Sequence, residues 1–177
     1  MKNYAVSGNM HANDLAEHLS RDLLRLTRLR CLGGPRGALG RRPPSLTVRA
    51  ATRERRLYGR ASFRRNAITI ILYRSTTRAD AAATLLHELV HLAGHVRHDA
   101  RFKAALVTAA REGFNVDVSA YERGSYKNLD RALENELAWR ATKAWAASLW
   151  ARVVGAYRRA WRTLEHAPIG ARESRRC

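Results

Sequence analysis

The stretch TRADAAATLLHELVHLAGHVRH, residues 77–98, predicts the helix around which the rest of the chain is organised. Thr77 followed three residues later by Asp80 is typical of a helix start at which the two residues cap each other's backbone N–H groups. Gly94 is a typical residue for the other end of a helix. Between these ends, apolar side chains fall on nearly every side, so we expect the helix to be buried.

Three ionisable residues, His87, Glu88 and His91, interrupt this buried helix, and such a conflict indicates a functional site. Residues four apart lie one turn apart on the same helical face, so both histidines can bind one Zn²⁺. Glu88 can then accept a proton from a zinc-activated water and pass it to a leaving amine. The spacing predicts a zinc-dependent hydrolase, in first place a peptidase, with Glu88 as its general base.

A catalytic zinc site commonly has a third protein ligand. His95 would lie two turns from His87 on a continued helix, about 11 Å along the axis, which is too far for a shared metal. The chain must therefore reverse at Gly94. His98 follows the turn by four residues and can reach back to the first two histidines, whereas His95 follows it directly and has little freedom to do so. We expect His98 to be the third ligand. The alternative is a glutamate from a later helix, for which the sequence offers Glu112, Glu122, Glu134 and Glu136.

Upstream of this helix, three short stretches are rich in β-branched and aromatic residues, which favours strands. They are Leu46–Val48, Leu57–Phe63 and Ala67–Tyr73. Strands at this spacing predict a small antiparallel three-stranded sheet packed on the motif helix. The expected fold class is therefore α+β.

Further helices are expected on both sides of this region. Leucines at a helical period predict a helix over His11–Arg30, followed by a basic linker whose glycines and prolines are expected to exclude regular structure. A helix is predicted over Asp99–Glu112, and a long helical region over Leu129–His166 with a break at Gly155. Four tryptophans at helical spacing in that region are expected to be core residues, with stacking on nucleic-acid bases as the alternative. They are Trp139, Trp145, Trp150 and Trp161. The tail, residues 168–177, is expected to be disordered.

The chain is strongly basic, with a formal net charge of +18, and 29 of its 33 basic residues are arginine. Residues 31–78 alone contain twelve arginines and one acid, Glu54. Such a field attracts polyanions, so we expect non-specific contact between this Arg-rich segment and nucleic acid. It also supports a second hypothesis, that the chain is a DNA-binding protein whose zinc site is structural or vestigial.

The apolar runs, the N-terminal residues and the two cysteines predict the cellular location of the protein. The longest apolar runs are too short to span a bilayer, so no membrane partner is expected. Residues 1–13 lack the apolar segment of a secretory signal. Cys31 and Cys177 are expected to be unpaired thiols. Together these features predict a cytoplasmic protein, with association with the nucleoid as a possibility raised by the charge.

The segment His87-Glu88-Leu89-Val90-His91, a short loop and then His98-Asp99-Ala100-Arg101-Phe102 resemble the SprT-like zinc metallopeptidases. The resemblance implies a zincin-like core over residues 45–116, with an N-terminal helix and linker (1–44), a helical extension (117–167) and the tail (168–177). It implies that His87, His91 and His98 bind zinc and that Glu88 is the catalytic base. It further implies a protein or peptide substrate, including proteins crosslinked to DNA, with the strand Ala67–Tyr73 beside the substrate cleft.

Overall fold

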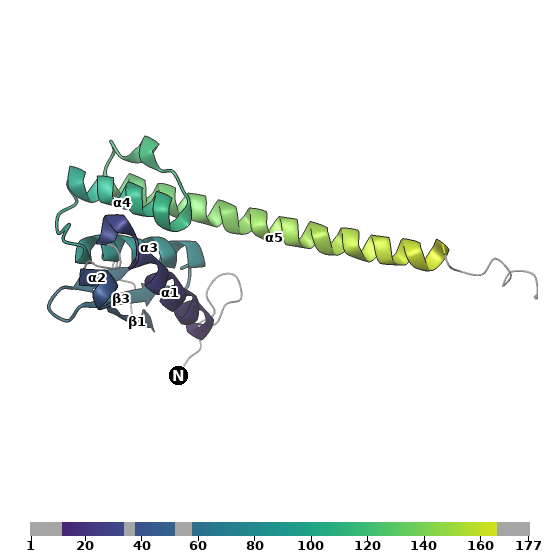
Figure 1. Ribbon diagram of the computed structural model, residues 1–177, viewed down its shortest axis with the longest axis horizontal. Helices are drawn as coiled ribbons and strands as arrows, with labels where there is room; N and C mark the ends of the chain where they lie inside the picture. The colour runs from purple at the N-terminus through teal and green to yellow at the C-terminus, as the bar shows by residue number, and fades with distance from the viewer. Residues whose placement is uncertain (1–11, 34–37, 52–57, 166–177) are drawn as a thin grey trace, which may run out of the picture. The chain divides into compact units, whose positions relative to one another are not determined.

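The computed structural model describes residues 12–33, 38–51 and 58–165. The predicted tail and the expected start of the first helix at His11 lie outside the described residues. The fold is α+β, and the chain divides into two compact units, one ending at Trp139 and the other beginning at Arg140. The elements of the first unit, the larger of which are labelled in Figure 1, are α1 (Ala12–Leu26), η1 (Arg30–Leu32), α2 (Ala38–Arg41), β1 (Ser45–Ala50), β2 (Gly59–Ser62), β3 (Ala67–Leu72), α3 (Arg78–Leu92), α4 (Ala100–Phe114), η2 (Ser119–Tyr121) and the start of α5 (Tyr126–Glu165).

The three predicted strands form a mixed sheet in the order β1-β3-β2, so the expectation of an antiparallel sheet was wrong for one pair. A tight turn with Asn66 at a φ of 44° joins β2 to β3, which makes this pair antiparallel. β1 pairs with the other edge of β3, with Ser45 opposite Ala67, and runs parallel to it. The prediction assumed that strands adjacent in sequence pair. The Ile-rich β3 instead takes the centre, because it alone buries every second side chain.

Helix α3 has both of the ends that its sequence predicts. The Asp80 N–H donates to Thr77 Oγ1 at 3.1 Å, and the Thr77 N–H donates to Asp80 Oδ2 at 2.7 Å. After Leu92 the chain turns at Gly94, whose φ of 108° suits glycine. The N–H groups of Gly94 and His95 donate to the carbonyls of His91 and Val90, which is a Schellman motif. This turn ends the helix and sends the chain back.

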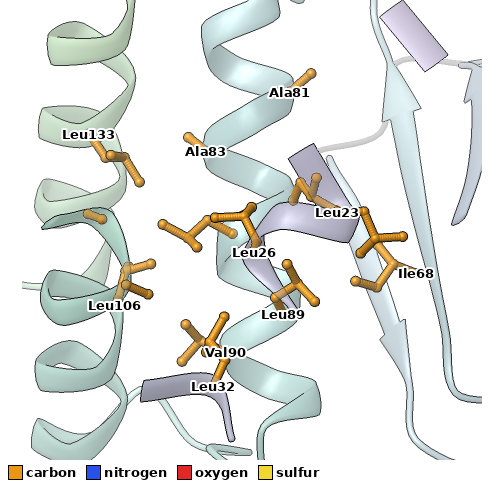
Figure 2. Packing of buried hydrophobic residues seen from close by; sticks show 14 of the residues in the cluster. Leu23, Leu26, Leu32, Ile68, Ala81, Ala83, Leu89, Val90, Leu106 and Leu133 are labelled. Atoms are coloured by element: carbon orange, nitrogen blue, oxygen red, sulfur yellow. The ribbon is translucent and has the colours of Figure 1, made fainter. Parts of the chain in front are cut away.

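The hydrophobic core surrounds α3: Figure 2 shows Leu106 of α4 and Leu133 of α5 on one side, and Ile68 of β3 with Leu23 of α1 on the other. Four apolar residues of α3 have no exposed surface, namely Leu85, Leu86, Leu89 and Val90. The predicted leucine face of α1 is also buried, with Leu15, Leu19, Leu23 and Leu26 each at most 5% exposed. Burial of this helix on several sides holds its polar residues in fixed positions. The linker that follows α1 was expected to lack regular structure, yet it contains the short helix α2, with Leu39 buried.

Helix α5 is continuous from Tyr126 to Glu165 and passes through Gly155 without the expected break. Its first turns belong to the first unit and bury Leu129 and Leu133 in the core. The prediction that its tryptophans are core residues was wrong, since all four are 53–69% exposed. Helical spacing predicts a stripe of side chains but not whether another element covers that stripe. Among the described residues, no helix is long and apolar enough to cross a membrane.

Candidate metal centre

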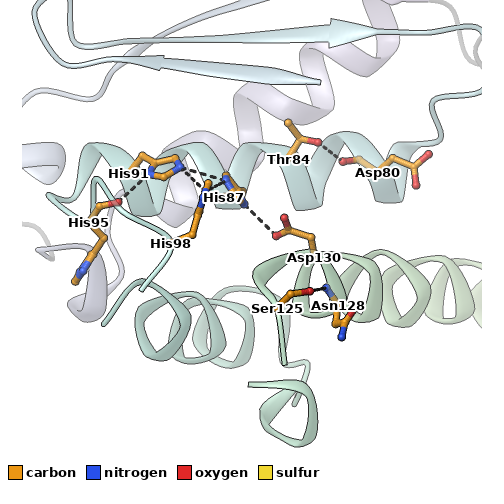
Figure 3. A network of polar contacts seen from close by, with 9 residues as sticks. All are labelled: Asp80, Thr84, His87, His91, His95, His98, Ser125, Asn128 and Asp130. Atoms are coloured by element: carbon orange, nitrogen blue, oxygen red, sulfur yellow. Dashed lines mark hydrogen bonds and ion pairs between the residues drawn. The ribbon is translucent and has the colours of Figure 1, made fainter. Parts of the chain in front are cut away.

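The imidazoles of His87, His91 and His98 point at one another, as Figure 3 shows. Their Nε2 atoms form a triangle with sides of 3.2 Å (His87–His91), 3.1 Å (His91–His98) and 3.0 Å (His98–His87). α3 supplies the first two, one turn apart. The Schellman turn at Gly94 returns the chain so that His98 faces them. Three histidines are thus close enough to hold one metal ion.

The donor set fits a zinc ion. Zn–N bonds of about 2.0–2.1 Å at tetrahedral angles separate the nitrogens by about 3.3 Å, close to the observed sides. His87 Nδ1 lies 3.0 Å from Asp130 Oδ1, and His91 Nδ1 lies 2.7 Å from the carbonyl oxygen of His95. Both acceptors require a proton on Nδ1, which leaves the Nε2 lone pair of each neutral ring free to ligate. Lone pairs in mutual contact repel, and a cation between them removes that repulsion.

Electrostatics also favour the neutral, ligating form of the imidazoles. The pKa of His91 lies below its ordinary value, chiefly because burial disfavours the charged ring. The pKa of His98 is lowered for the same reason, and neighbouring His87 and His91 lower it further. Because metal binding requires deprotonated nitrogen, this environment reduces the competition from protons near neutral pH.

Two aromatic rings hold the imidazoles in place. The buried Phe102 of α4 has its ring centroid 4.7–4.8 Å from those of all three histidines. Tyr126, the first residue of α5, stacks on His98 with a centroid distance of 3.9 Å and an interplanar angle of 16°. His98 is exposed and follows a turn, so this stacking restricts a side chain that the backbone alone would leave mobile.

Glu88 is buried beside the triangle, with 8% of its surface exposed. Burial raises the pKa of its carboxyl, while the nearby His87 and the N–H of Ala61 in β2 partly offset that rise. The close approach of Glu88 to β2 depends on Gly59. A Cβ on Gly59 would lie 2.6 Å from Thr84 Cγ2 and 2.8 Å from Glu88 Oε1. Only a residue without a side chain fits between this strand and the glutamate.

The three histidines and Glu88 share one pocket of about 300 Å³. Its wall continues through Tyr58 and Gly59 on the β2 side and through Tyr126, Asp130 and Glu134 on α5. The pKa of Glu134 is raised to about 7, first by burial and then by the negative charges of Asp80 and Asp130. β2 borders the pocket through Gly59, and no residue of the strand Ala67–Tyr73, which was expected beside the substrate cleft, lines the pocket.

The other predicted candidates take different places. His95 contributes its backbone carbonyl to His91, and its ring is not part of the triangle. Glu134 lines the pocket, while Glu112, Glu122 and Glu136 do not. Within the described ranges, none of these glutamates joins the metal-binding group. The free thiol of Cys31 is likewise outside it.

Sequence reasoning missed Asp130 and Tyr126. Both come from a helix that begins 28 residues after His98. One signal was present in the sequence, since Tyr126, Asp130 and Glu134 recur every four residues and therefore share one face of α5. Polar residues at that spacing also describe an ordinary solvated face.

No match to a known protein adds to this geometry. No family model matches the sequence, and neither a curated protein nor a solved structure matches the chain.

Proposed function

We propose that this protein is a zinc-dependent metallopeptidase with a zincin-like core. The observation that carries the proposal is the convergence of three Nε2 atoms within 3.0–3.2 Å in the pocket that also contains the buried carboxyl of Glu88. His87, His91 and His98 would hold the Zn²⁺. When bound, zinc supplies Lewis acidity, which acidifies water and polarises a carbonyl.

The residues of the chain have separate tasks in this proposal. Glu88 accepts the proton of the attacking water and donates it to the leaving amine, and the raised pKa of its carboxyl suits a group that must both take and release a proton. Asp130 holds His87 through Nδ1, and the His95 carbonyl holds His91 in the same way.

A peptide substrate is favoured by the place of β2. β2 is an edge strand, since the sheet order is β1-β3-β2, and it borders the pocket through Gly59. An extended peptide can add to such an edge through main-chain hydrogen bonds, which would place its scissile bond near Glu88. A small non-peptide substrate would not form these main-chain hydrogen bonds with β2.

Substitution of Glu88 by glutamine tests the mechanism. The Glu88→Gln protein should retain one zinc per chain, measured by metal analysis, and lose cleavage of casein and of itself by at least about 100-fold, the lower range for a general base. Glu136→Gln is the matched control, because Glu136 is an exposed acid outside the pocket. Cleavage by Glu88→Gln at the rate of the parent protein would refute the proposed role.

The alternative is a DNA-binding protein with a structural zinc site, and the charge of +18 is the observation in its favour. Structural zinc sites are closed by four protein ligands, whereas three histidines that open into a pocket with a buried acid suit catalysis better. Zinc-loaded protein that binds DNA in a salt-dependent manner and cleaves no protein would favour the alternative. Both activities together would support a substrate associated with DNA.

A further inference from the structure

In the second unit, α5 runs from Arg140 to Glu165, and residues 140–163 of it have a composition unlike that of the first unit. All six charged residues of 140–163 are basic, and one acid, Glu165, ends the helix. It also presents large apolar side chains to solvent: Trp145, Trp150 and Tyr157 are 66%, 69% and 67% exposed. We call this stretch the C-terminal segment of α5. It forms no part of the metal centre.

The two kinds of side chain occupy opposite sides of the C-terminal segment. At about 100° per residue, large apolar residues fall within one arc of about 180°, which we call the aromatic face: Trp145, Leu149, Trp150, Val153, Tyr157 and Trp161. The opposite arc, the arginine face, consists of Arg140, Arg152, Arg158, Arg159 and Arg162. Lys143 lies near one border of the aromatic face. Each member of the aromatic face is at least 44% exposed.

We propose that the C-terminal segment of α5 binds to the surface of an anionic lipid bilayer. Helices that lie in a membrane interface combine a tryptophan- and leucine-containing face with a polar face rich in arginine. The aromatic face would enter the boundary between headgroups and acyl chains, while the arginines bind lipid phosphates. The segment is about 36 Å long at 1.5 Å per residue. Its arginines prevent it from crossing the bilayer, in agreement with the absence of a spanning helix among the described residues.

Charge complementarity selects an anionic partner over a second copy of the chain. Two copies that paired through the aromatic face would need opposite charges along the borders of the seam. The segment has only positive charges there, at Arg152 and Lys143. Lipid phosphates neutralise these same groups, and long basic side chains can reach headgroups from the edge of a buried apolar face.

The separation of the two faces selects a bilayer over a nucleic acid. A protein that binds single strands stacks bases on aromatic rings and binds the same strand's phosphates with basic groups, so both must lie along one groove. Here most of the rings and most of the arginines lie on opposite sides of the helix, and Arg152 alone among the arginines lies at the border of the aromatic face, beside Trp145. A duplex would contact the arginine face and leave six large apolar side chains in water. An interface between an anionic layer and an apolar layer uses both faces at once.

Vesicle sedimentation with the full-length protein tests the proposal. The probes are vesicles of phosphatidylcholine with about 30% phosphatidylglycerol and vesicles of phosphatidylcholine alone. We expect partition onto the anionic vesicles at least tenfold stronger than onto the neutral ones, decreasing with added salt. Tryptophan fluorescence should shift to shorter wavelength on binding, because the rings leave water.

Matched variants identify the segment responsible. Replacement of Arg158, Arg159 and Arg162 by glutamine should weaken partition onto anionic vesicles on the order of 100-fold. Replacement of the same three residues by lysine keeps the positive charges and should leave partition unchanged. The control is glutamine at Arg28, Arg30 and Arg123, three exposed arginines of the first unit outside the Arg-rich segment and the pocket, which removes the same charge elsewhere.

A second pair of variants tests the apolar contribution. Trp150→Ala should weaken partition on the order of tenfold, and Phe63→Ala, which removes an exposed ring from the first unit, should have little effect. Circular dichroism verifies that each variant remains helical.

Four results would overturn the proposal. The first is equal partition onto anionic and neutral vesicles. The second is an equal loss of partition when either set of three arginines is replaced by glutamine. The third is binding of an oligonucleotide, weakened by the glutamine replacements at Arg158, Arg159 and Arg162, without binding of vesicles, which assigns the segment to nucleic acid. The fourth is a dimer in solution that does not bind vesicles and that the Trp150→Ala substitution dissociates. This result assigns the aromatic face to a second copy of the chain. None of these outcomes depends on peptidase activity.

Discussion

Removal of the Asp130 carboxylate should weaken zinc binding without removing a ligand. Asp130 Oδ1 lies 3.0 Å from His87 Nδ1, and the two side chains are only 23% and 13% exposed. In Asp130→Ala, His87 loses the acceptor that fixes its tautomer and its ring orientation. The imidazole can then rotate or carry its proton on Nε2, and both changes compete with metal binding.

The size of the effect follows from this contact. A hydrogen bond to a charged group contributes about 1.5–3 kcal/mol, and a factor of ten in affinity corresponds to about 1.4 kcal/mol. The zinc Kd should therefore rise by about 10–100-fold, the range found when such supporting carboxylates are removed. Asp130→Asn retains an acceptor oxygen and loses the charge, so its Kd should rise less, by about three- to tenfold.

Competition between the protein and a chromophoric zinc chelator measures these constants at fixed pH and salt. Glu136→Ala is the control, since it removes one carboxylate from the same helix outside the pocket. It should change the Kd by less than about twofold, as expected for an exposed charge. If Asp130→Ala and Glu136→Ala bind zinc with the same Kd and both remain folded, Asp130 does not support the site.

Three further predictions concern the pocket. Gly59→Ala places a methyl group 2.8 Å from Glu88 Oε1, so casein cleavage should decrease at least about tenfold while the zinc Kd is retained. Tyr126→Ala removes the ring stacked on His98 and should raise the zinc Kd about threefold or more, whereas Tyr126→Phe should not. In zinc-free protein, the pKa of Glu134 at about 7 exceeds its ordinary 4.5, so the folded state binds a proton more tightly than the unfolded state. This contribution to stability is complete below pH 4.5 and is lost as pH rises through 7, and Glu134→Gln should flatten the pH dependence of thermal unfolding by about 1–2 kcal/mol after allowance for solvent screening.

The features predicted correctly are those that depend on residues close together in the sequence. The capping pair at Thr77 and Asp80, the turn at Gly94 and the leucine face of α1 each depend on residues within a few positions of one another. The same locality explains why the positions of His87, His91 and His98 could be inferred together. One turn of helix and one reversal fix their relative placement.

Features that depend on distant segments were not predicted. β1 pairs in parallel with β3 and not with β2, the next strand in the sequence, and strand propensity contains no information about that choice. Asp130 contacts His87 across 43 residues of sequence. Trp150 was expected in the core because helical spacing of apolar residues is typical of a buried face. The same spacing also occurs on a helix face that no other element covers, and Trp150 is exposed.

The local spacing of the three histidines has a consequence for the order in which the site assembles during synthesis. Their ligand atoms lie on residues 87–98, so their convergence closes only a short loop, and the entropic cost of closure grows slowly with length. A nascent chain can therefore present all three imidazoles before Tyr126 and Asp130 have been synthesised. Under the proposed function, a zinc ion captured at that stage would be held more weakly, and its affinity would increase when the first turns of α5 pack against α3. The zinc dissociation constant would then report whether that part of the chain has docked.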